Sequence, residues 1–284
     1  MKYLLIFLFM ALALSIMAED ILTLQGNATQ GGILVGKVSS RVEKIFLDYQ
    51  EMPLADSTFI IGFDRDSKLR HILTIVMQNG QMETTEFCLT KREYETQRID
   101  NIPPEYLEDP KDKDVIDRIE RESATLKKTR ERIYNNQNIY LDNFTIPVEN
   151  GRVSGIFGCN RILNGTPVSP HNGLDISAPL GTEIRSMATG IVALTGDYFY
   201  NGKFVLIDHG CGLSSIYIHM SNIYVEKGDY IICGDKIGEV GCTGRSTGNH
   251  LHWGISWKGE RIDPALIIKQ NNIFFKLSSI VGTD

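Results

Sequence analysis

The sequence has little that would suit a nucleic-acid-binding or an integral membrane protein. Its 29 lysine and arginine residues are outnumbered by 35 acidic residues, the net charge is −6, and no dense basic block could follow a phosphate backbone. Beyond its N-terminal end, no segment approaches the about 20 apolar residues that span a bilayer. We therefore expect neither nucleic acid as a partner nor a membrane span in the mature chain.

Two familiar zinc-binding patterns are also absent. The chain has five cysteines, none of them in a C-x-x-C pair, so a thiolate zinc site is not indicated. The helical motif H-E-x-x-H does not occur either, and a zinc hydrolase would therefore need another scaffold. The odd number of cysteines leaves at least one unpaired within a monomer. These cysteines are Cys88, Cys159, Cys211, Cys233 and Cys242.

Residues 1–18, "MKYLLIFLFMALALSIMA", resemble a secretory signal peptide. One early lysine precedes an apolar run from Tyr3 to Met17, and the small residue Ala18 precedes an acidic pair. An uncleaved membrane anchor is the alternative, but the run is shorter than the about 20 residues that a span requires. We expect cleavage after Ala18 and export to the periplasm or cell envelope.

Residues 19–90 predict a small β-sandwich-like domain. Short apolar stretches such as "GGILVGKV", "TFIIGF" and "HILTIVM" are separated by Gly, Asn, Asp and Pro, which is typical of strands and turns. Asn79-Gly80 marks a hairpin between two of the strands. His71, which begins one strand and has no metal-binding partner nearby in the sequence, is expected at the surface.

Residues 91–140 form a charged connector that includes a helix. Val115, Ile119, Leu126 and Ile133 are spaced as a narrow apolar stripe, which favours a helix packed on one side. An amphipathic membrane helix is the alternative, but the stripe lacks bulky aromatic residues.

Residues 141–270 are again β-rich and interrupted by glycines, and residues 271–284 form a C-terminal tail. Alternating patterns and close turns in "KFVLIDHG", "SSIYIHM" and "NHLHWGIS" predict an antiparallel sheet. The fold class is therefore mainly β, with a second β domain after the connector.

Two histidines share one face of a predicted strand in "GRSTGNHLHWGISW". Because residues i and i+2 of a strand point the same way, His250 and His252 lie opposite an apolar face that includes Leu251 and Trp253. The apolar face is complete without them, which argues against two ordinary core histidines. In "HNGLDIS", alternation likewise places Asp175 opposite the apolar residues of its strand.

The remaining histidines of this region are less alike. In "SSIYIHM", alternation puts His219 and Tyr217 together on the polar face, with Tyr217 a weaker candidate for a substrate contact. His209 shares a face with Val205 and Ile207, which favours a structural role.

Two imidazoles and one carboxylate form a suitable ligand set for a catalytic zinc ion, which keeps a further position for water. Peptide hydrolysis also needs a proton acceptor and a proton donor, and histidines outside the ligand set could serve. A structural zinc site would usually have a fourth protein ligand, commonly cysteine.

The motifs "HNGLDISAPLGTEI", "YIHM" and "GCTGRSTGNHLHWGI" resemble those of the lysostaphin/LytM-type zinc metallopeptidases, which are peptidoglycan endopeptidases. The resemblance extends from about Phe144 to Ile267, with "FGCNRILNGTP" leading and "RIDPALI" closing. It is specific because all three motifs occur in order and at the expected spacing.

The resemblance implies the residue roles. His171, Asp175 and His252 match the ligands of one zinc ion per chain. His219 and His250 match the catalytic histidines, and which of them is the base remains open.

The resemblance further implies an exported zinc endopeptidase that hydrolyses the peptide cross-links of bacterial peptidoglycan. The alternative is a non-catalytic relative that binds peptidoglycan or activates wall amidases. Such a relative is expected to have lost ligands, whereas all five positions here carry competent residues. Whether the bond cut is D-alanyl–diaminopimelate or lies in a glycine bridge is left open, as are protein partners, and the N-terminal part is expected to position or cover the substrate site.

Overall fold

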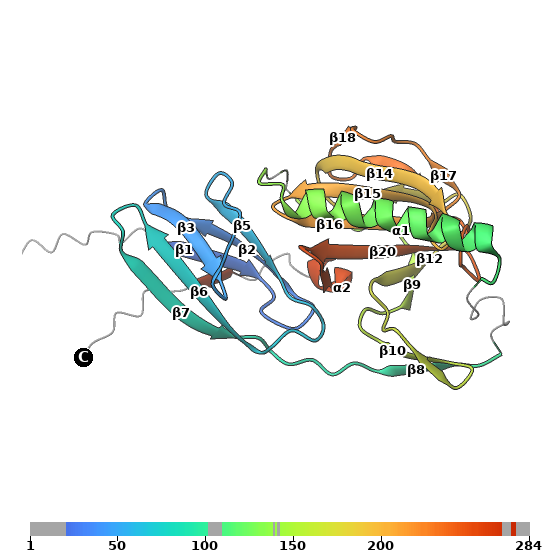
Figure 1. Ribbon diagram of the computed structural model, residues 1–284, viewed down its shortest axis with the longest axis horizontal. Helices are drawn as coiled ribbons and strands as arrows, with labels where there is room; N and C mark the ends of the chain where they lie inside the picture. The colour runs from blue at the N-terminus through green and yellow to red at the C-terminus, as the bar shows by residue number, and fades with distance from the viewer. Residues whose placement is uncertain (1–20, 102–109, 139, 141–142, 269–273, 277–284) are drawn as a thin grey trace, which may run out of the picture.

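The computed structural model describes residues 21–101, 110–138, 140, 143–268 and 274–276. It consists of two β-rich parts joined by a connector with one long helix (Figure 1), so the prediction of a mainly β fold is confirmed. The predicted signal peptide, residues 1–18, lies outside the described residues. Within the described ranges, no helix has the length and apolar character needed to cross a membrane.

The N-terminal part is a sandwich of two four-stranded sheets, with strand orders β22-β1-β2-β5 and β4-β3-β6-β7. The strands are β1 (Leu22–Gly26), β2 (Ile33–Val38), β3 (Val42–Leu47), β4 (Gln50–Glu51), β5 (Thr58–Gly62), β6 (Arg70–Met77), β7 (Met82–Cys88) and β22 (Phe274–Lys276). The last of these comes from the predicted C-terminal tail and pairs with β1.

The core of the sandwich explains why these residues form strands. Phe59, Ile61 and Ile45 are fully buried, and the alternation in β3 exposes the charged residues between its apolar ones. The predicted hairpin at Asn79-Gly80 joins β6 to β7, and Gly80 takes the positive φ of 83° that the turn requires.

The C-terminal part is built on an eight-stranded sheet in the order β18-β14-β15-β16-β20-β12-β9, with β21 paired to β20. All of its pairings are antiparallel, as predicted. Its strands are β9 (Arg152–Gly155), β12 (Leu174–Ser177), β14 (Gly190–Tyr198), β15 (Gly202–Gly210), β16 (Leu213–Met220), β18 (Tyr230–Ile231), β20 (His250–Trp257) and β21 (Glu260–Ile262).

Two three-stranded sheets and a short helix complete this part. The sheet β13-β19-β17 consists of β13 (Glu183–Arg185), β19 (Lys236–Glu239) and β17 (Asn222–Ile223). The sheet β11-β10-β8 consists of β11 (Thr166–Val168), β10 (Asn160–Leu163) and β8 (Thr96–Ile99). Helix α2 (Pro264–Ile268) follows β21. The predicted domains, residues 19–90 and 141–270, remain a prediction; β22 and β8 lie outside these bounds although they pair with strands of the two β-rich parts.

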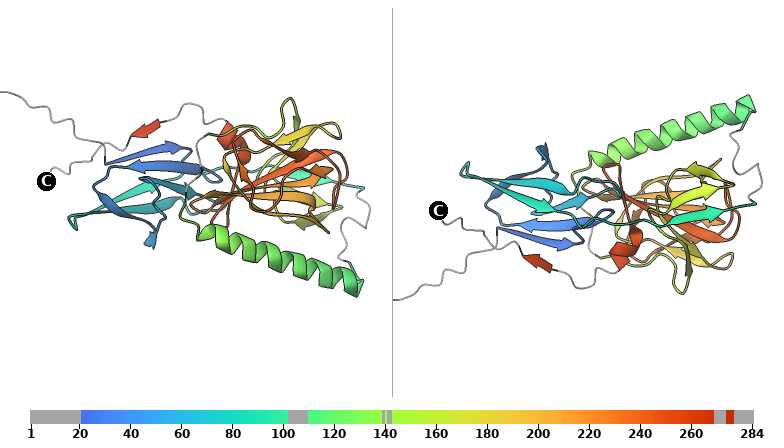
Figure 2. Two further views of the ribbon diagram at one scale, coloured as in Figure 1. Left: turned by 90° about the horizontal axis from the view of Figure 1, so that it is seen from above. Right: turned by 90° about the horizontal axis from the view of Figure 1, so that it is seen from below.

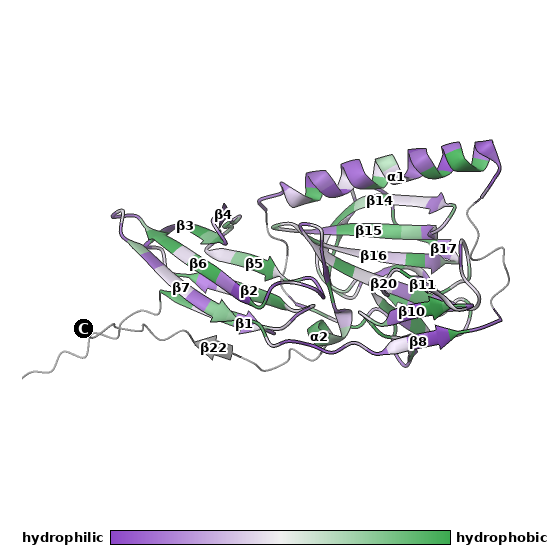
Figure 3. Cartoon of the chain, turned by 60° about the horizontal axis from the view of Figure 1, so that its bottom comes forward, coloured by the Kyte–Doolittle hydropathy of each residue, from purple (hydrophilic) through white to green (hydrophobic). Residues whose placement is uncertain are grey.

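The connector is more than a linker. Helix α1 (Lys113–Tyr134) begins at the N-cap Asp112 and lies along the larger sheet (Figures 1 and 2). The C-terminal half of its apolar stripe packs there, with Ile133 and Leu126 in one apolar cluster with Phe204 and Leu206, while most of the helix is hydrophilic (Figure 3). This contact favours the one-sided connector over the membrane helix. Strand β8 precedes the helix and pairs in parallel with β10 of the C-terminal part.

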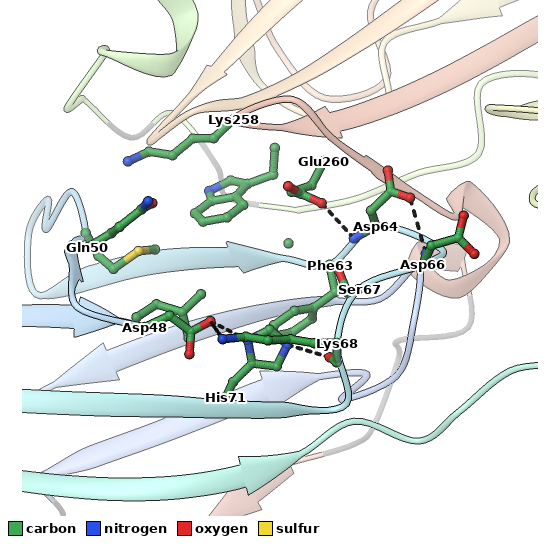
Figure 4. Close-up of a pocket in the computed structure, with 14 residues that line it drawn as sticks. Asp48, Gln50, Phe63, Asp64, Asp66, Ser67, Lys68, His71, Lys258 and Glu260 are labelled. Carbon is green, nitrogen blue, oxygen red and sulfur yellow. Dashed lines mark hydrogen bonds and ion pairs between the residues drawn. The ribbon is translucent and has the colours of Figure 1, made fainter.

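The sandwich contacts the C-terminal part beyond the C-terminal end of β20, where β21 follows. Asp64 accepts a hydrogen bond from the Arg261 backbone N–H at 3.0 Å, and Glu260 accepts one from the Asp64 N–H at 3.2 Å. A cavity of about 430 Å³ lies at this junction, lined by these carboxylates and by Trp257 and His71 among others (Figure 4).

His71 is not the surface residue that the sequence suggested. It is only 6% exposed, and its Nδ1 lies 2.7 Å from Asp48 Oδ2. The position of His71 at the start of a strand gave no sign of this partner, because Asp48 lies in the turn after β3. The rings of Phe63 and Phe87 pack on the imidazole and help to bury it.

Candidate active site

Strands β12 and β20 place a carboxylate and an imidazole directly opposite each other. In their antiparallel register, Asp175 pairs with His252 and Ser177 pairs with His250. Leu251 and Trp253 are fully buried on the other face of β20, so the alternation predicted for this segment is confirmed.

His171 completes a cluster of three donor atoms with Asp175 and His252. His171 Nε2 lies 2.9 Å from Asp175 Oδ1 and 3.0 Å from His252 Nδ1, and His252 Nδ1 lies 2.7 Å from Asp175 Oδ1. Among the described His, Cys, Asp and Glu residues, these three form a group whose ligand atoms all fall within 4.8 Å of one another.

The backbone directly after β9 orients His171. Its Nδ1 lies 2.9 Å from the carbonyl oxygen of Ile156, which can only accept, so Nδ1 carries the hydrogen. In the neutral ring the lone pair is then on Nε2, the nitrogen that faces Asp175 and His252. A hydrogen bond from the second nitrogen to a carbonyl is the usual arrangement for a histidine that binds a metal.

Glycine makes room for the cluster. A Cβ atom on Gly173 would lie 2.8 Å from His252 Nε2, closer than real Cβ contacts allow. The same Cβ would lie 2.5 Å from the backbone oxygen of Trp253, so any larger residue at position 173 would disturb β20 and the imidazole that it carries.

The electrostatics prepare the three residues to bind a cation. Burial opposes ionisation of Asp175, but the contacts with the His171 and His252 imidazoles outweigh burial and hold the pKa of Asp175 well below its usual value. Burial lowers the pKa of His252, which keeps that imidazole neutral. An ionised carboxylate and neutral imidazoles are the protonation states in which these groups bind metals.

A β-bulge brings His219 to the same face. Lys203 pairs with Met220 but Val205 pairs with Tyr217, so β16 has one residue more than β15 in this interval. His219 has a positive φ of 66°, an uncommon backbone conformation that turns its side chain away from the simple alternation. Its ring centroid lies 4.9 Å from that of His250 and 6.4 Å from that of His252.

The prediction that Tyr217 lies on the face of His219 is therefore wrong. Tyr217 pairs with Trp253 in the register of β16 and β20 and is fully buried, so it faces the core. Its hydroxyl accepts a hydrogen bond from the Met187 N–H at 2.8 Å and lies 3.0 Å from Ser215 Oγ.

His219 and His250 are held in the same tautomer by backbone carbonyls. His219 Nδ1 lies 2.9 Å from the oxygen of Thr243, and His250 Nδ1 lies 2.8 Å from the oxygen of Gly248. In each neutral ring the lone pair is therefore on Nε2. Burial is the main cause that lowers the pKa of His219 to about 4, so this imidazole is neutral near pH 7.

His250 also lies near the carboxylate of the cluster. Its Nε2 is 4.0 Å from Asp175 Oδ1, which places a fifth ionisable side chain beside the three donor atoms. The structure thus brings together all five residues that the sequence analysis selected: His171, Asp175, His219, His250 and His252.

His209 stays outside this group, in agreement with its predicted structural role. It is fully buried, with Nδ1 2.9 Å from the oxygen of Thr189 and Nε2 2.7 Å from Ser215 Oγ. The five cysteines, all within the described residues, form no disulfide.

Sequence reasoning assigned no role to Arg161, whose Nη2 lies 3.1 Å from Asp175 Oδ2. It belongs to the "FGCNR" stretch of the leading motif, so the signal was present but pointed to no partner.

The donor set suits zinc. Two imidazoles and one ionised carboxylate converge, and His171 Nε2 and Asp175 Oδ1 face each other at a distance that calls for a cation or a proton between them. Two further histidines adjoin the cluster, so the site combines ligands for a metal with groups that can carry protons.

Comparison with known proteins connects this geometry to a family. The model of peptidase family M23 matches residues 169–264, which contain all five site residues. A peptidoglycan DD-endopeptidase of Vibrio cholerae, ShyA, is 38% identical over 113 residues, which is 39% of this chain and 26% of that protein. The DD-carboxypeptidase/endopeptidase Mpg of Neisseria meningitidis is 37% identical over 97 residues, covering 34% of this chain and 22% of that protein.

A solved structure matches most of the chain. A crystal structure from Pseudomonas aeruginosa, assigned to peptidase M23, has a TM-score of 0.59 and 30% sequence identity, and the match covers 85% of this chain and 95% of that one. By contrast, the chain spans about a quarter of the length of the curated relatives it matches.

Proposed function

Because this chain belongs to peptidase family M23, we propose that it is an exported zinc-dependent endopeptidase that hydrolyses the peptide cross-links of bacterial peptidoglycan. The observation that carries the proposal is the convergence of His171 Nε2, Asp175 Oδ1 and His252 Nδ1 within 4.8 Å of one another. Relatives named peptidoglycan DD-endopeptidases support a bond between D-amino acids as the one cut.

His171, Asp175 and His252 would hold the zinc ion. When bound, zinc supplies Lewis acidity, which favours ionisation of water near neutral pH and polarises a carbonyl group. The chain's own contribution is an ionised carboxylate and two imidazoles, and His171 already has the lone pair of its neutral ring on Nε2, the nitrogen that faces the cluster.

Proton transfer falls to His219 and His250. Each holds its Nδ1 hydrogen on a backbone carbonyl and presents a lone pair on Nε2, so each can accept a proton from water or, once protonated, give one to the leaving amine. The unusual backbone of His219 supports a functional role, since strained conformations are kept at sites that need a particular side-chain direction.

A muropeptide assay tests the proposal. The full mature chain, loaded with zinc, is incubated with isolated peptidoglycan, and the released muropeptides are identified by mass spectrometry with and without a chelator. We expect cross-linked dimers to become monomers, and the conversion to stop on chelation. The masses also identify the bond, because a glycine bridge and a D-alanyl bond leave different ends, and removal of a terminal D-alanine would indicate a carboxypeptidase instead.

An Asp175→Asn chain is the matched control, since it keeps the size of the side chain but removes the charge that a zinc ligand needs. Intact dimers from a zinc-loaded wild-type chain would refute the endopeptidase. Binding of that chain to peptidoglycan would then favour the non-catalytic alternative.

A further inference from the structure

Arg161 contacts the oxygen of Asp175 that the histidines do not use. Arg161 Nη2 lies 3.1 Å from Asp175 Oδ2, whereas Oδ1 lies 2.9 Å from His171 Nε2 and 2.7 Å from His252 Nδ1. The two oxygens of one carboxylate therefore have different partners. A guanidinium at Oδ2 leaves Oδ1 as the oxygen directed at the two imidazoles.

The Asp175 carboxylate has little room to rotate and so to swap the positions of Oδ1 and Oδ2. Gly155, on the neighbouring strand β9, approaches so closely that a Cβ atom there would lie 2.3 Å from Asp175 Oδ2. The Asp175 side chain is 14% exposed and that of Arg161 is 27% exposed, so the ion pair is partly shielded from water. Rotation of the carboxylate would have to break a charge-assisted hydrogen bond in this confined place.

The strand that carries Arg161 is itself held from two sides. β10 lies between β11 and β8, and Arg161 is opposite Gln97 of the connector strand. Next to it, the Asn160 N–H donates to the oxygen of Glu95 at 2.9 Å, and Arg65 Nη1 of the sandwich donates to Asn160 Oδ1 at 3.1 Å. Arg161 thus projects from a braced strand and not from a free loop.

We propose that Arg161 is a positioning residue that makes Asp175 a ligand through one oxygen, an inference that rests on the proposed zinc site. A carboxylate bound through both oxygens occupies two positions around a metal, whereas a catalytic zinc site needs one position open. By retaining Oδ2, Arg161 keeps Asp175 in the one-oxygen mode. Groups that orient a metal ligand in this way typically change metal affinity or activity by about 10–100-fold when they are lost.

The competing interpretation is an ion pair that only stabilises the fold. It predicts a change in the unfolding of the metal-free chain but no change in how the metal is held. Zinc affinity and the visible spectrum of the cobalt-substituted chain separate the two interpretations, because the spectrum reports the number and arrangement of ligands.

The test uses the full chain with Arg161→Met, which keeps the bulk and removes the hydrogen bond and charge. Arg98→Met is the matched control, since Arg98 is exposed on the adjacent strand β8. Zinc affinity is measured by competition with a chelating dye. We expect the zinc Kd to rise about 10–100-fold in Arg161→Met, with an altered cobalt spectrum, and to change by less than about two-fold in Arg98→Met.

If the methionine variant does not fold, the same measurements are made on Arg161→Lys. Lysine keeps the charge but lacks the planar fork, so we expect weakened zinc binding and a shifted cobalt spectrum in this variant too. A wild-type zinc Kd and cobalt spectrum in the folded variants, with or without a loss of metal-free stability, would overturn the positioning role and leave the zinc site intact. If instead the wild-type chain bound zinc no better than His171→Ala, the proposed function itself would fail.

Discussion

Replacing Tyr217 by phenylalanine tests whether its hydroxyl faces the core or the proposed active site. The substitution keeps the buried ring and removes one oxygen, which accepts a hydrogen bond from the Met187 N–H and lies 3.0 Å from Ser215 Oγ. Tyr217 is fully buried, so water cannot replace the lost oxygen without opening the core. The Met187 N–H is then left without this acceptor.

An unsatisfied buried donor costs about 1–3 kcal/mol, and we expect the free energy of unfolding to fall by this amount. Urea unfolding followed by tryptophan fluorescence is a suitable assay, because both tryptophans, Trp253 and Trp257, lie on β20, and Trp253 is opposite Tyr217. The KM and kcat for peptidoglycan fragments are measured on the same samples, and we expect neither to change.

Tyr224→Phe is the matched control. Tyr224 is 53% exposed and its hydroxyl donates to Glu239 at 2.7 Å, so water can replace that bond. We expect a loss of less than about 0.5 kcal/mol. If Tyr217→Phe kept wild-type stability but raised KM, the hydroxyl would face the substrate. The argument that the bulge at His219 directs Tyr217 into the core would then be refuted.

Three further predictions concern the site and the core beneath it. His171→Ala and Asp175→Ala should each lose bound zinc and hydrolysis together, and stoichiometric zinc in either purified variant would contradict the ligand assignment. His219→Ala should keep its zinc, measured by metal analysis, while kcat falls by about 10²–10⁴-fold; departure of the zinc would make His219 a ligand instead. Burial lowers the pKa of His209 to about 4 from an ordinary 6.5, so its contribution to stability is present above pH 6.5 and declines as the pH falls towards 4, by roughly 3 kcal/mol in total. In the metal-free chain, His209→Gln should flatten the fall in unfolding free energy across this range, and an unchanged slope would show that His209 titrates normally.

Regular strands explain why the faces of the strands that carry the site could be predicted, whereas the residue roles followed from the family resemblance. The faces of β12 and β20 followed from alternation alone. The pairing of these two strands has no register shift around Asp175 and His252. Alternation failed at Tyr217 because the bulge at His219 depends on pairing with β15, which no local pattern in "SSIYIHM" reveals.

The residues that escaped prediction have partners distant in the chain. Arg161, on β10, contacts Asp175, which lies on β12 in a different sheet. His71, on β6, contacts Asp48, which lies in the turn after β3. The connector strand β8 was hidden as well, since a parallel pairing to β10 leaves no hairpin signal between the two segments. Composition and periodicity describe one segment at a time, and these contacts join segments.

The parallel pairing of β8 with β10 also constrains how the chain can fold and be cut. The two strands are separated by the whole of α1, so their pairing closes a long loop and requires residues up to at least Leu163 to be synthesised before β8 finds its neighbour. A fragment that starts after Asp100 would expose the edge of β10, whose unpaired N–H and C=O groups could pair with other molecules. We therefore expect the C-terminal part to be aggregation-prone when produced without the strand that precedes its helix.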